Sequence, residues 1–251
     1  IGQDVYGLGY GHSLRFDNDD NLWVVDKGTN AVTKFNPSGY VVLNLGRRPE
    51  GFDDYEHPPA SEARQVDGYF GGPTDVGWDA DGNIYVSDGY INSRVGKMDK
   101  WGNWLKSWGS YGREDGQLRL PHNLQVDRQG RVYVADRSNR RIQKYDSEGN
   151  LLGTIVLNVP YDKTAQPVLG NPNPNLPDNT APWTLCISSG ETQYLFASDE
   201  IPGRIYKLTL DGEILGWLGG SGRAPGQFNW LHGISCRDEN VLYVADMNNW
   251  R

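Results

Sequence analysis

One pattern recurs five times along the 251 residues of the chain. In its clearest copy, from Gly116 to Asp146, a Pro-His step leads into a short apolar run, an Asp-x-x-Gly turn, an alternating strand ending at Asp136 and a further strand. Alternating Val, Ile, Tyr and Leu between Asp, Gly and Asn turns are typical of a β-meander. The other copies begin near Gly11, Pro73, Pro182 and Leu231.

The repeat length predicts how these units stack. A single four-stranded meander cannot bury both of its faces, and units of about 40 to 50 residues with four short strands favour radial stacking into a β-propeller. The Asp that ends the second strand gives the register, with steps of 62, 48, 63 and 47 residues between Asp26, Asp88, Asp136, Asp199 and Asp246. The two long steps contain insertions rich in Pro and Gly, at 47–72 and 157–181, which we expect to be surface loops.

We therefore predict one all-β propeller domain over residues 1–251, covering about four to five blades. The chain begins without Met and stops at Arg251, two strands into its fifth repeat, which predicts a piece of a longer chain. A net charge of -8 disfavours nucleic acid as a partner. No apolar run is long enough to span a membrane, and the first residues lack the layout of a signal peptide.

Two cysteines occur, Cys186 and Cys236, each in the first strand of its repeat. Strand cysteines in different blades would need unusual closeness to form a disulfide. We expect them to be two separate, buried, small hydrophobic residues.

Three of the four histidines occupy one repeat position. His12, His122 and His232 stand 14 residues before the repeat Asp, where the second repeat has Thr74 and the fourth, allowing two extra turn residues, has Trp183. Equivalent positions form a ring about a propeller axis, so in a six-bladed propeller alternate blades lie about 120° apart and the three imidazoles converge. Three imidazoles with an open fourth position suit a catalytic zinc ion. The alternative is a ring of polar residues lining a water-filled channel.

Further polar side chains follow the repeat Asp. Tyr90, Arg94 and Arg137 come just after the second strands of their repeats, so strand direction places them at the same end as the histidines. A tyrosine near a divalent metal ion and an arginine suits a general base. The structural alternatives are an aromatic lid for Tyr90 and salt bridges to the repeat Asp for the arginines.

Four segments carry a family resemblance. SDGYINSR, LPHNLQVD, VADRSNRRIQ and LHGI resemble NHL repeats and, in combination, the lyase domain of peptidylglycine α-amidating enzymes. The resemblance implies a six-bladed NHL-type propeller in which three histidines hold Zn²⁺ and peptidyl-α-hydroxyglycine is cleaved to a peptide amide and glyoxylate. By motif, His12, His122 and His232 would be the zinc ligands, Tyr90 the base and Arg137 an active-site arginine.

The resemblance also implies secondary sites and partners. Arg94 and Trp230 would contact substrate, Trp230 standing where the family has a Met, and the backbone of Leu14 would contribute to a structural Ca²⁺ site. Gly233 replaces an acidic residue of that family, Ile91 replaces a cysteine and its disulfide, and a second arginine has no counterpart.

The implied substrate is a small peptide or amide, and the implied partner is a hydroxylating monooxygenase, fused or separate. The implied location is extracellular or the lumen of the secretory pathway. A metal-dependent propeller hydrolase or lactonase and a non-catalytic NHL scaffold are the alternatives, because fold alone does not choose between them.

Overall fold

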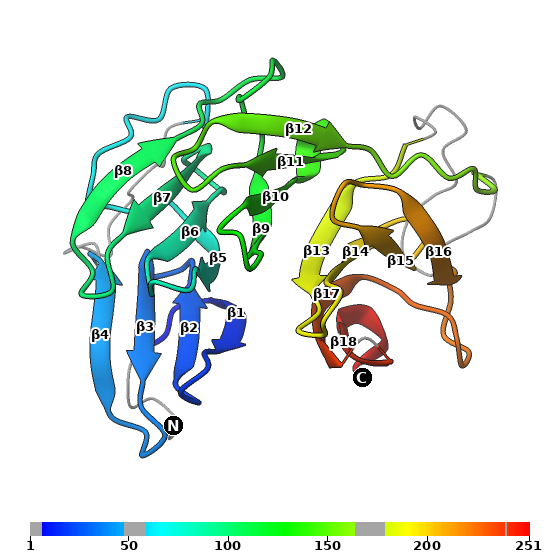
Figure 1. The fold of residues 1–251 in the computed structure, drawn as a ribbon, viewed down its shortest axis with the longest axis horizontal. Coiled ribbons are helices and arrows are strands. Elements are labelled where there is room, and N and C mark those ends of the chain that lie inside the picture. Colours follow the sequence, from blue (N-terminus) through cyan, green and yellow to red (C-terminus); the bar gives the residue numbers. More distant parts are fainter. Residues whose placement is uncertain (1–6, 48–58, 164–178, 239) are drawn as a thin grey trace.

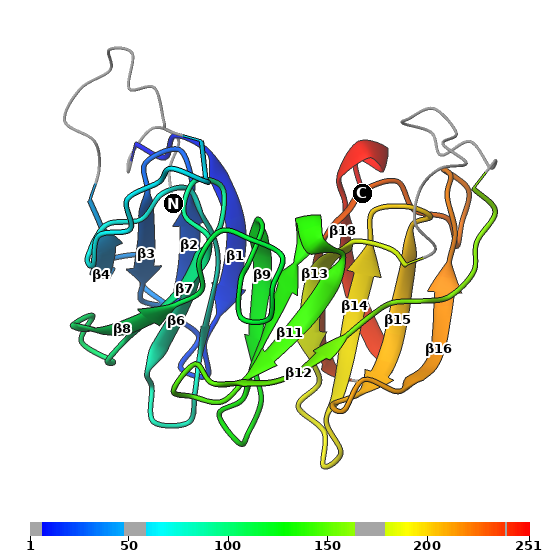
Figure 2. The same cartoon turned by 90° about the horizontal axis from the view of Figure 1, so that it is seen from above.

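The computed structural model describes residues 7–47, 59–163, 179–238 and 240–251. Its strands form four four-stranded antiparallel sheets and one two-stranded sheet, each built from consecutive strands. The sheets follow one another around a central axis (Figure 1), and Figure 2 shows them from above. The prediction of an all-β propeller is confirmed, with four complete blades and two strands of a fifth; the total of six blades stays a prediction.

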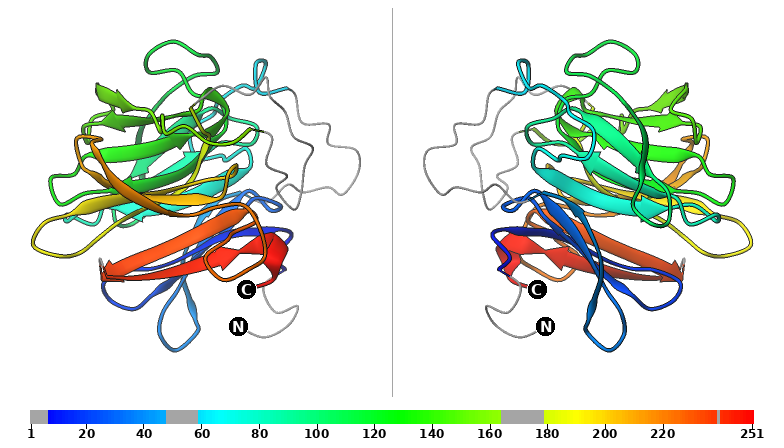
Figure 3. Two further views of the ribbon diagram at one scale, coloured as in Figure 1. Left: turned by 90° about the vertical axis from the view of Figure 1, so that its right-hand side faces the viewer. Right: turned by 90° about the vertical axis from the view of Figure 1, so that its left-hand side faces the viewer.

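The blades follow chain order. Blade 1 consists of β1 (Gly11–Phe16), β2 (Leu22–Asp26), β3 (Ala31–Phe35) and β4 (Val41–Gly46), and blade 2 of β5 (Pro73–Trp78), β6 (Ile84–Asp88), β7 (Arg94–Met98) and β8 (Trp104–Trp108). Blade 3 consists of β9 (Pro121–Val126), β10 (Val132–Asp136), β11 (Arg141–Tyr145) and β12 (Leu151–Ile155), and blade 4 of β13 (Pro182–Ile187), β14 (Tyr194–Asp199), β15 (Arg204–Thr209) and β16 (Ile214–Gly219). Blade 5 has β17 (Leu231–Asp238) and β18 (Val241–Asp246). Figure 3 shows the β1–β4 sheet and the β17–β18 hairpin on the same side of the molecule.

The hydrophobic core lies between neighbouring blades. One cluster joins Val25 of blade 1 to Val86 of blade 2, and another joins Leu185 of blade 4 to Tyr133 of blade 3. Blade 3 has a neighbouring blade on each side, and every residue of β10 is fully buried. The outermost strand β12 instead alternates between partly buried and exposed positions along most of its length. Burial of apolar surface between blades thus holds the ring together and fixes where each first strand meets the axis.

The Asp that marks the repeat in the sequence anchors the chain as it enters blades 1, 2, 3 and 5. The carboxylate of Asp26 accepts the backbone N–H of Gly9 at 2.6 Å, and that of Asp136 accepts the backbone N–H of Arg119 at 2.7 Å. Asp88 and Asp246 accept equivalent bonds. Such bonds offset the desolvation of a buried carboxylate. These hydrogen bonds fix the position of the segment that precedes the first strand of the blade.

The two cysteines form a disulfide. Cys186 of β13 and Cys236 of β17 are bonded with an S–S distance of 2.09 Å, across a Cα–Cα distance of 6.0 Å. The expectation of two unbonded cysteines is therefore wrong, although both side chains are buried. First strands of consecutive blades lie side by side around the axis, so these two positions of β13 and β17, 50 residues apart in the chain, come within bonding reach.

The described ends of both predicted insertions pack on the blades. The carbonyl oxygens of Val66 and Tyr69 accept hydrogen bonds from Arg94, and Asn179 exchanges hydrogen bonds with Arg140 of blade 3. The remainder of these insertions, at 48–58 and 164–178, lies outside the described residues. Within the described ranges, no helix has the length and apolar character needed to cross a membrane.

Candidate metal centre

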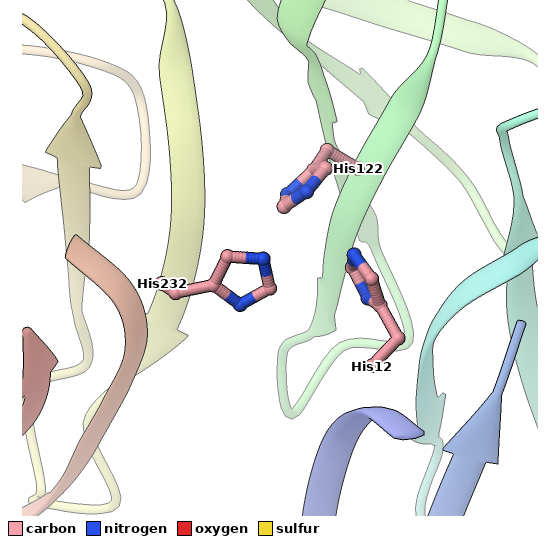
Figure 4. Close-up of side chains that lie close together, drawn as sticks. All are labelled: His12, His122 and His232. Atoms are coloured by element: carbon pink, nitrogen blue, oxygen red, sulfur yellow. The ribbon is translucent and has the colours of Figure 1, made fainter. Parts of the chain in front are cut away.

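Three histidines meet at the propeller axis. His12 lies on β1, His122 on β9 and His232 on β17, so each comes from the first strand of an odd-numbered blade. Their ring centroids are 4.8 Å apart for His12 and His122, 4.8 Å for His12 and His232, and 5.2 Å for the remaining pair. One ring nitrogen from each lies within 4.8 Å of the others. Figure 4 shows the rings converging from separate strands.

Backbone carbonyls of the even-numbered blades orient two of these rings. Nδ1 of His12 is 2.7 Å from the carbonyl oxygen of Thr74, and Nδ1 of His122 is 2.8 Å from that of Trp183. A carbonyl only accepts, so each Nδ1 carries the proton and each Nε2 presents a lone pair. Carbonyl partners of this kind are typical of metal-ligating histidines.

The Nε2 atom of His122 is buried without a hydrogen-bond partner. Buried polar atoms normally have one, so an orphaned lone pair beside two further imidazoles indicates a ligand position. Within the described part of the chain, these histidines are the one group of three or more His, Cys, Asp or Glu side chains close enough to hold a metal ion. Three imidazole nitrogens fit zinc and related transition metals.

Burial, assisted by neighbouring positive charge, favours the neutral form of all three rings. Burial, followed by the nearby His232, lowers the pKa of His12 to about 4. Burial and the two other histidines lower the pKa of His122 well below its ordinary value, and burial together with the charge of Arg137 lowers that of His232. Metal binding requires unprotonated imidazole, so the site does not need to lose protons at neutral pH before it accepts a cation.

Tyr90 lies beside this centre. It lies in the loop that joins β6 to β7 within blade 2, and its hydroxyl is 3.1 Å from Nε2 of His12. The close packing of Gly72 seats the ring, because a Cβ on Gly72 would lie 2.6 Å from the Cβ of Tyr90 and the glycine has a φ of +68°. Burial raises the pKa of Tyr90, and the charge of Arg137, which is hydrogen-bonded to it, opposes that rise.

Arg137 is held flat against an aromatic ring. It begins the short 3-10 helix η1 (Arg137–Asn139), and its guanidinium carbon lies 3.3 Å from the ring centre of Trp183. Trp183 is 1% exposed and also packs against His122, with ring centroids 4.9 Å apart. The tryptophan that replaces histidine in the fourth repeat therefore supports both a predicted ligand and a predicted active-site arginine. Burial lowers the pKa of Arg137, while the charges of Glu200 and Tyr90 raise it.

The structure does not place Arg94 at the centre. Its side chain is fully buried, with Nε 3.1 Å from a carboxylate oxygen of Asp88 and the guanidinium stacked on Trp104. Arg94 begins β7 and pairs with Asp88 across the blade, and its contact with substrate stays a prediction. Arg141 makes the equivalent salt bridge to Asp136, which leaves Arg137 free of it.

Two other predicted residues lie nearer the edge of the site. Trp230 is partly buried, and its ring centroid is 5.6 Å from that of Trp183; its contact with substrate stays a prediction. Leu14 pairs with Val24 in the β1–β2 ladder, and a role for its backbone in calcium binding also stays a prediction. The buried carboxylate of Asp75, in the neighbouring first strand, is already paired with Arg15 at 2.6 Å.

The sequence reading missed two charged residues. Lys27 lies 3.8 Å above the ring centre of Tyr90, and Glu200 attracts Arg137 electrostatically. Each is the first residue after the repeat Asp of its blade, the position that Arg137 occupies in blade 3. This shared position in the repeat could have indicated that Lys27 and Glu200 lie near the centre, as Arg137 does.

Comparisons with known proteins agree with this architecture. An NHL repeat is matched at residues 118–145, which contain β9, β10 and β11. The chain is 29% identical, over 94% of its length, to peptidyl-glycine alpha-amidating monooxygenase A of Xenopus laevis, of which it covers 23%. It is 32% identical, over 59% of its length, to a probable peptidyl-alpha-hydroxyglycine alpha-amidating lyase of Caenorhabditis elegans, of which it covers 41%.

The fold is shared with a more distant lyase. Virginiamycin B lyase from Staphylococcus aureus superimposes with a TM-score of 0.57 at 12% identity, over 96% of this chain and 65% of that one. At this identity the likeness concerns the fold alone. The chain is thus a β-propeller that contains an NHL repeat and is similar in sequence to amidating enzymes, and it spans less than half the length of the two relatives named above.

Proposed function

We propose that this propeller is a zinc-dependent lyase that cleaves the C–N bond of peptidyl-α-hydroxyglycine and releases a peptide amide and glyoxylate. The observation that carries the proposal is the convergence of three neutral imidazoles with the Tyr90 hydroxyl, 3.1 Å from Nε2 of His12. The similarity to amidating lyases and monooxygenases supports the choice of substrate.

His12, His122 and His232 would hold the metal ion. The Nδ1 bonds to Thr74 and Trp183 direct the Nε2 atoms of two of them toward it. A bound divalent ion would act as a Lewis acid toward a substrate oxygen and would favour the ionised form of a nearby phenol.

Tyr90 is the proton acceptor in this proposal. It takes the proton of the substrate's α-hydroxyl, the electrons of that O–H bond form the carbonyl of glyoxylate, and the C–N bond breaks with its electron pair on nitrogen. The nitrogen then takes up a proton, so no water is consumed. Arg137 donates a hydrogen bond to Tyr90 and stabilises the phenolate, which offsets part of the burial that raises the pKa of this residue.

The substrate implies an upstream enzyme. An α-hydroxyglycine arises when the α-carbon of a C-terminal glycine is hydroxylated, so we propose a monooxygenase as fused or separate partner. The Xenopus relative carries that activity in its name. We also propose an extracellular or secretory-pathway location, because a disulfide such as Cys186–Cys236 persists in oxidising compartments.

Glyoxylate release tests the proposal. Zinc-loaded protein should convert α-hydroxyhippurate to benzamide and glyoxylate, and Tyr90→Phe should lower kcat by about 10²- to 10⁴-fold with unchanged zinc content. Tyr40→Phe, at a tyrosine that is 70% exposed, is the matched control and should retain full activity. Esterase or lactonase turnover without glyoxylate would favour the hydrolase alternative, and the absence of any turnover would favour a scaffold.

A further inference from the structure

Lys27 is held over the face of Tyr90 by two aromatic rings. It is the first residue after β2, and its Nζ lies 3.8 Å from the ring centre of Tyr90 and 4.3 Å from that of Tyr10. Cation–π contacts of this kind position an ammonium group without neutralising its charge. Lys27 is itself partly buried, whereas Tyr10 is 58% exposed, so the ammonium lies between solvent and the histidine centre.

The ammonium of Lys27 has no ion-pair partner among the residues that the structure describes. The adjacent carboxylate of Asp26 is taken up by the backbone N–H groups of Gly9, Tyr10 and Gly28 and by the Thr29 hydroxyl. Three other lysines that are buried or partly buried differ. A carboxylate oxygen lies 3.0 Å from the Nζ atom of each of Lys34, Lys97 and Lys144.

A second cation lies nearby. Burial and the charge of Arg137 both lower the pKa of Lys27, which means that the two positive charges repel each other within this site. Arg137 has Glu200 as an attracting carboxylate, but Lys27 does not share it. A partly buried cation that lacks a counter-ion and faces another cation favours the arrival of an anion.

We propose that Lys27 binds the carboxylate of the substrate and makes the site selective for acids over the corresponding amides or esters. This inference rests on the proposed function, which puts the substrate's α-hydroxyl at the oxygen of Tyr90. In an α-hydroxyglycine the carboxylate is attached to the same carbon as that hydroxyl. Lys27, whose ammonium lies 3.8 Å from the ring centre of Tyr90, has no carboxylate partner among the described residues and is therefore available to this carboxylate.

Binding of an inert acid tests this assignment separately from catalysis. Isothermal titration of zinc-loaded protein with hippurate, which lacks the reacting hydroxyl, should give a Kd that rises about ten- to a hundredfold in Lys27→Met. Hippuramide, the neutral analogue, should bind more weakly to the wild-type protein and be insensitive to the substitution. Lys27→Arg should retain hippurate binding within a few fold, because it keeps the charge.

A lysine on an aromatic ring far from the centre is the matched control. Lys100 lies 4.6 Å from the ring centre of Trp101, and Lys100→Met should leave the affinity for hippurate unchanged. The assignment is overturned if wild-type protein does not prefer hippurate to hippuramide, or if Lys27→Met binds hippurate as well as the wild type does. If the predicted binding pattern holds but glyoxylate is never released, the proposed reaction is wrong while the anion site stands.

Discussion

Odd- and even-numbered blades contribute differently to the centre, although they share one repeat. At the position before each first strand's apolar run, blades 1, 3 and 5 carry histidines, whereas blades 2 and 4 carry Thr74 and Trp183. At this position the even blades contribute main-chain carbonyl oxygens, which accept the Nδ1–H of His12 and His122. One ring position thus supplies ligand side chains in one set of blades and orienting carbonyls in the other.

In Thr74, the side chain and the backbone have different roles. The side chain of Thr74 points into its own surroundings, where its hydroxyl bonds Ser87 and the carbonyl of Pro121. Its carbonyl nevertheless fixes the ring of His12. Substitutions of the histidines in odd blades should therefore remove the metal ion, whereas substitution of Thr74 in blade 2 should alter stability while leaving the metal ion in place.

The largest effect is expected from an odd blade. His122→Ala removes the most buried ligand, so zinc content measured by atomic emission should fall from about one equivalent to less than about 0.2, and glyoxylate release should fall at least about a thousandfold. Circular dichroism of the variant should remain that of a β-propeller. Full zinc occupancy in a folded His122→Ala variant would contradict the three-histidine site.

An intermediate effect is expected from an even blade. Thr74→Val keeps the carbonyl that orients His12 but removes the buried hydroxyl, so the free energy of unfolding should fall by about 1–3 kcal/mol. Urea denaturation of the metal-free protein measures this change. Zinc content should equal that of the wild type, and its loss would mean that side chains of even blades also determine ligand geometry.

The smallest effect concerns protons. The pKa of His12 is about 4 in the folded protein against 6.5 for an ordinary histidine. Above pH 6.5 both states are neutral, but as pH falls from 6.5 toward 4 the unfolded chain takes up a proton that folded His12 does not, so metal-free protein loses stability. Its Tm should drop by a few degrees between pH 7 and pH 5.

The matched variant isolates this contribution. Buried Asp88 and Asp199 have raised pKa values, so they contribute in the opposite direction as pH falls. His12→Ala should therefore show a smaller drop in Tm than the wild type over the same interval. An equal drop in both proteins would place the acid sensitivity elsewhere.

The repeat in the sequence predicted the strands well because each is bounded by a local signal. The further strand predicted after Asp136 is β11, and the Asp register placed three histidines on one ring. The first inference needs only the alternation of apolar and polar residues, and the second needs only the number of residues between each histidine and the repeat Asp. The roles of the Thr74 and Trp183 carbonyl groups could not be predicted from the sequence, because every residue has a backbone carbonyl.

Other features depended on distances between blades. Cys186 and Cys236 bond because neighbouring first strands are adjacent, which periodicity alone does not state. Arg94 and Arg137 both follow a repeat Asp in the chain, yet only Arg137 precedes the third strand and reaches the centre. Lys27 shared the register of Arg137 and was overlooked because its partners are aromatic rings from other segments.

The disulfide has a consequence for proteolytic processing. Residues 223–227, between β16 and β17, are all exposed and lie inside the segment closed by Cys186 and Cys236. A protease that cuts once there, for example after Arg223, produces two polypeptides that remain covalently joined. His232 would then stay in the same molecule as His12 and His122 after cleavage, and only reduction would allow the C-terminal piece to leave.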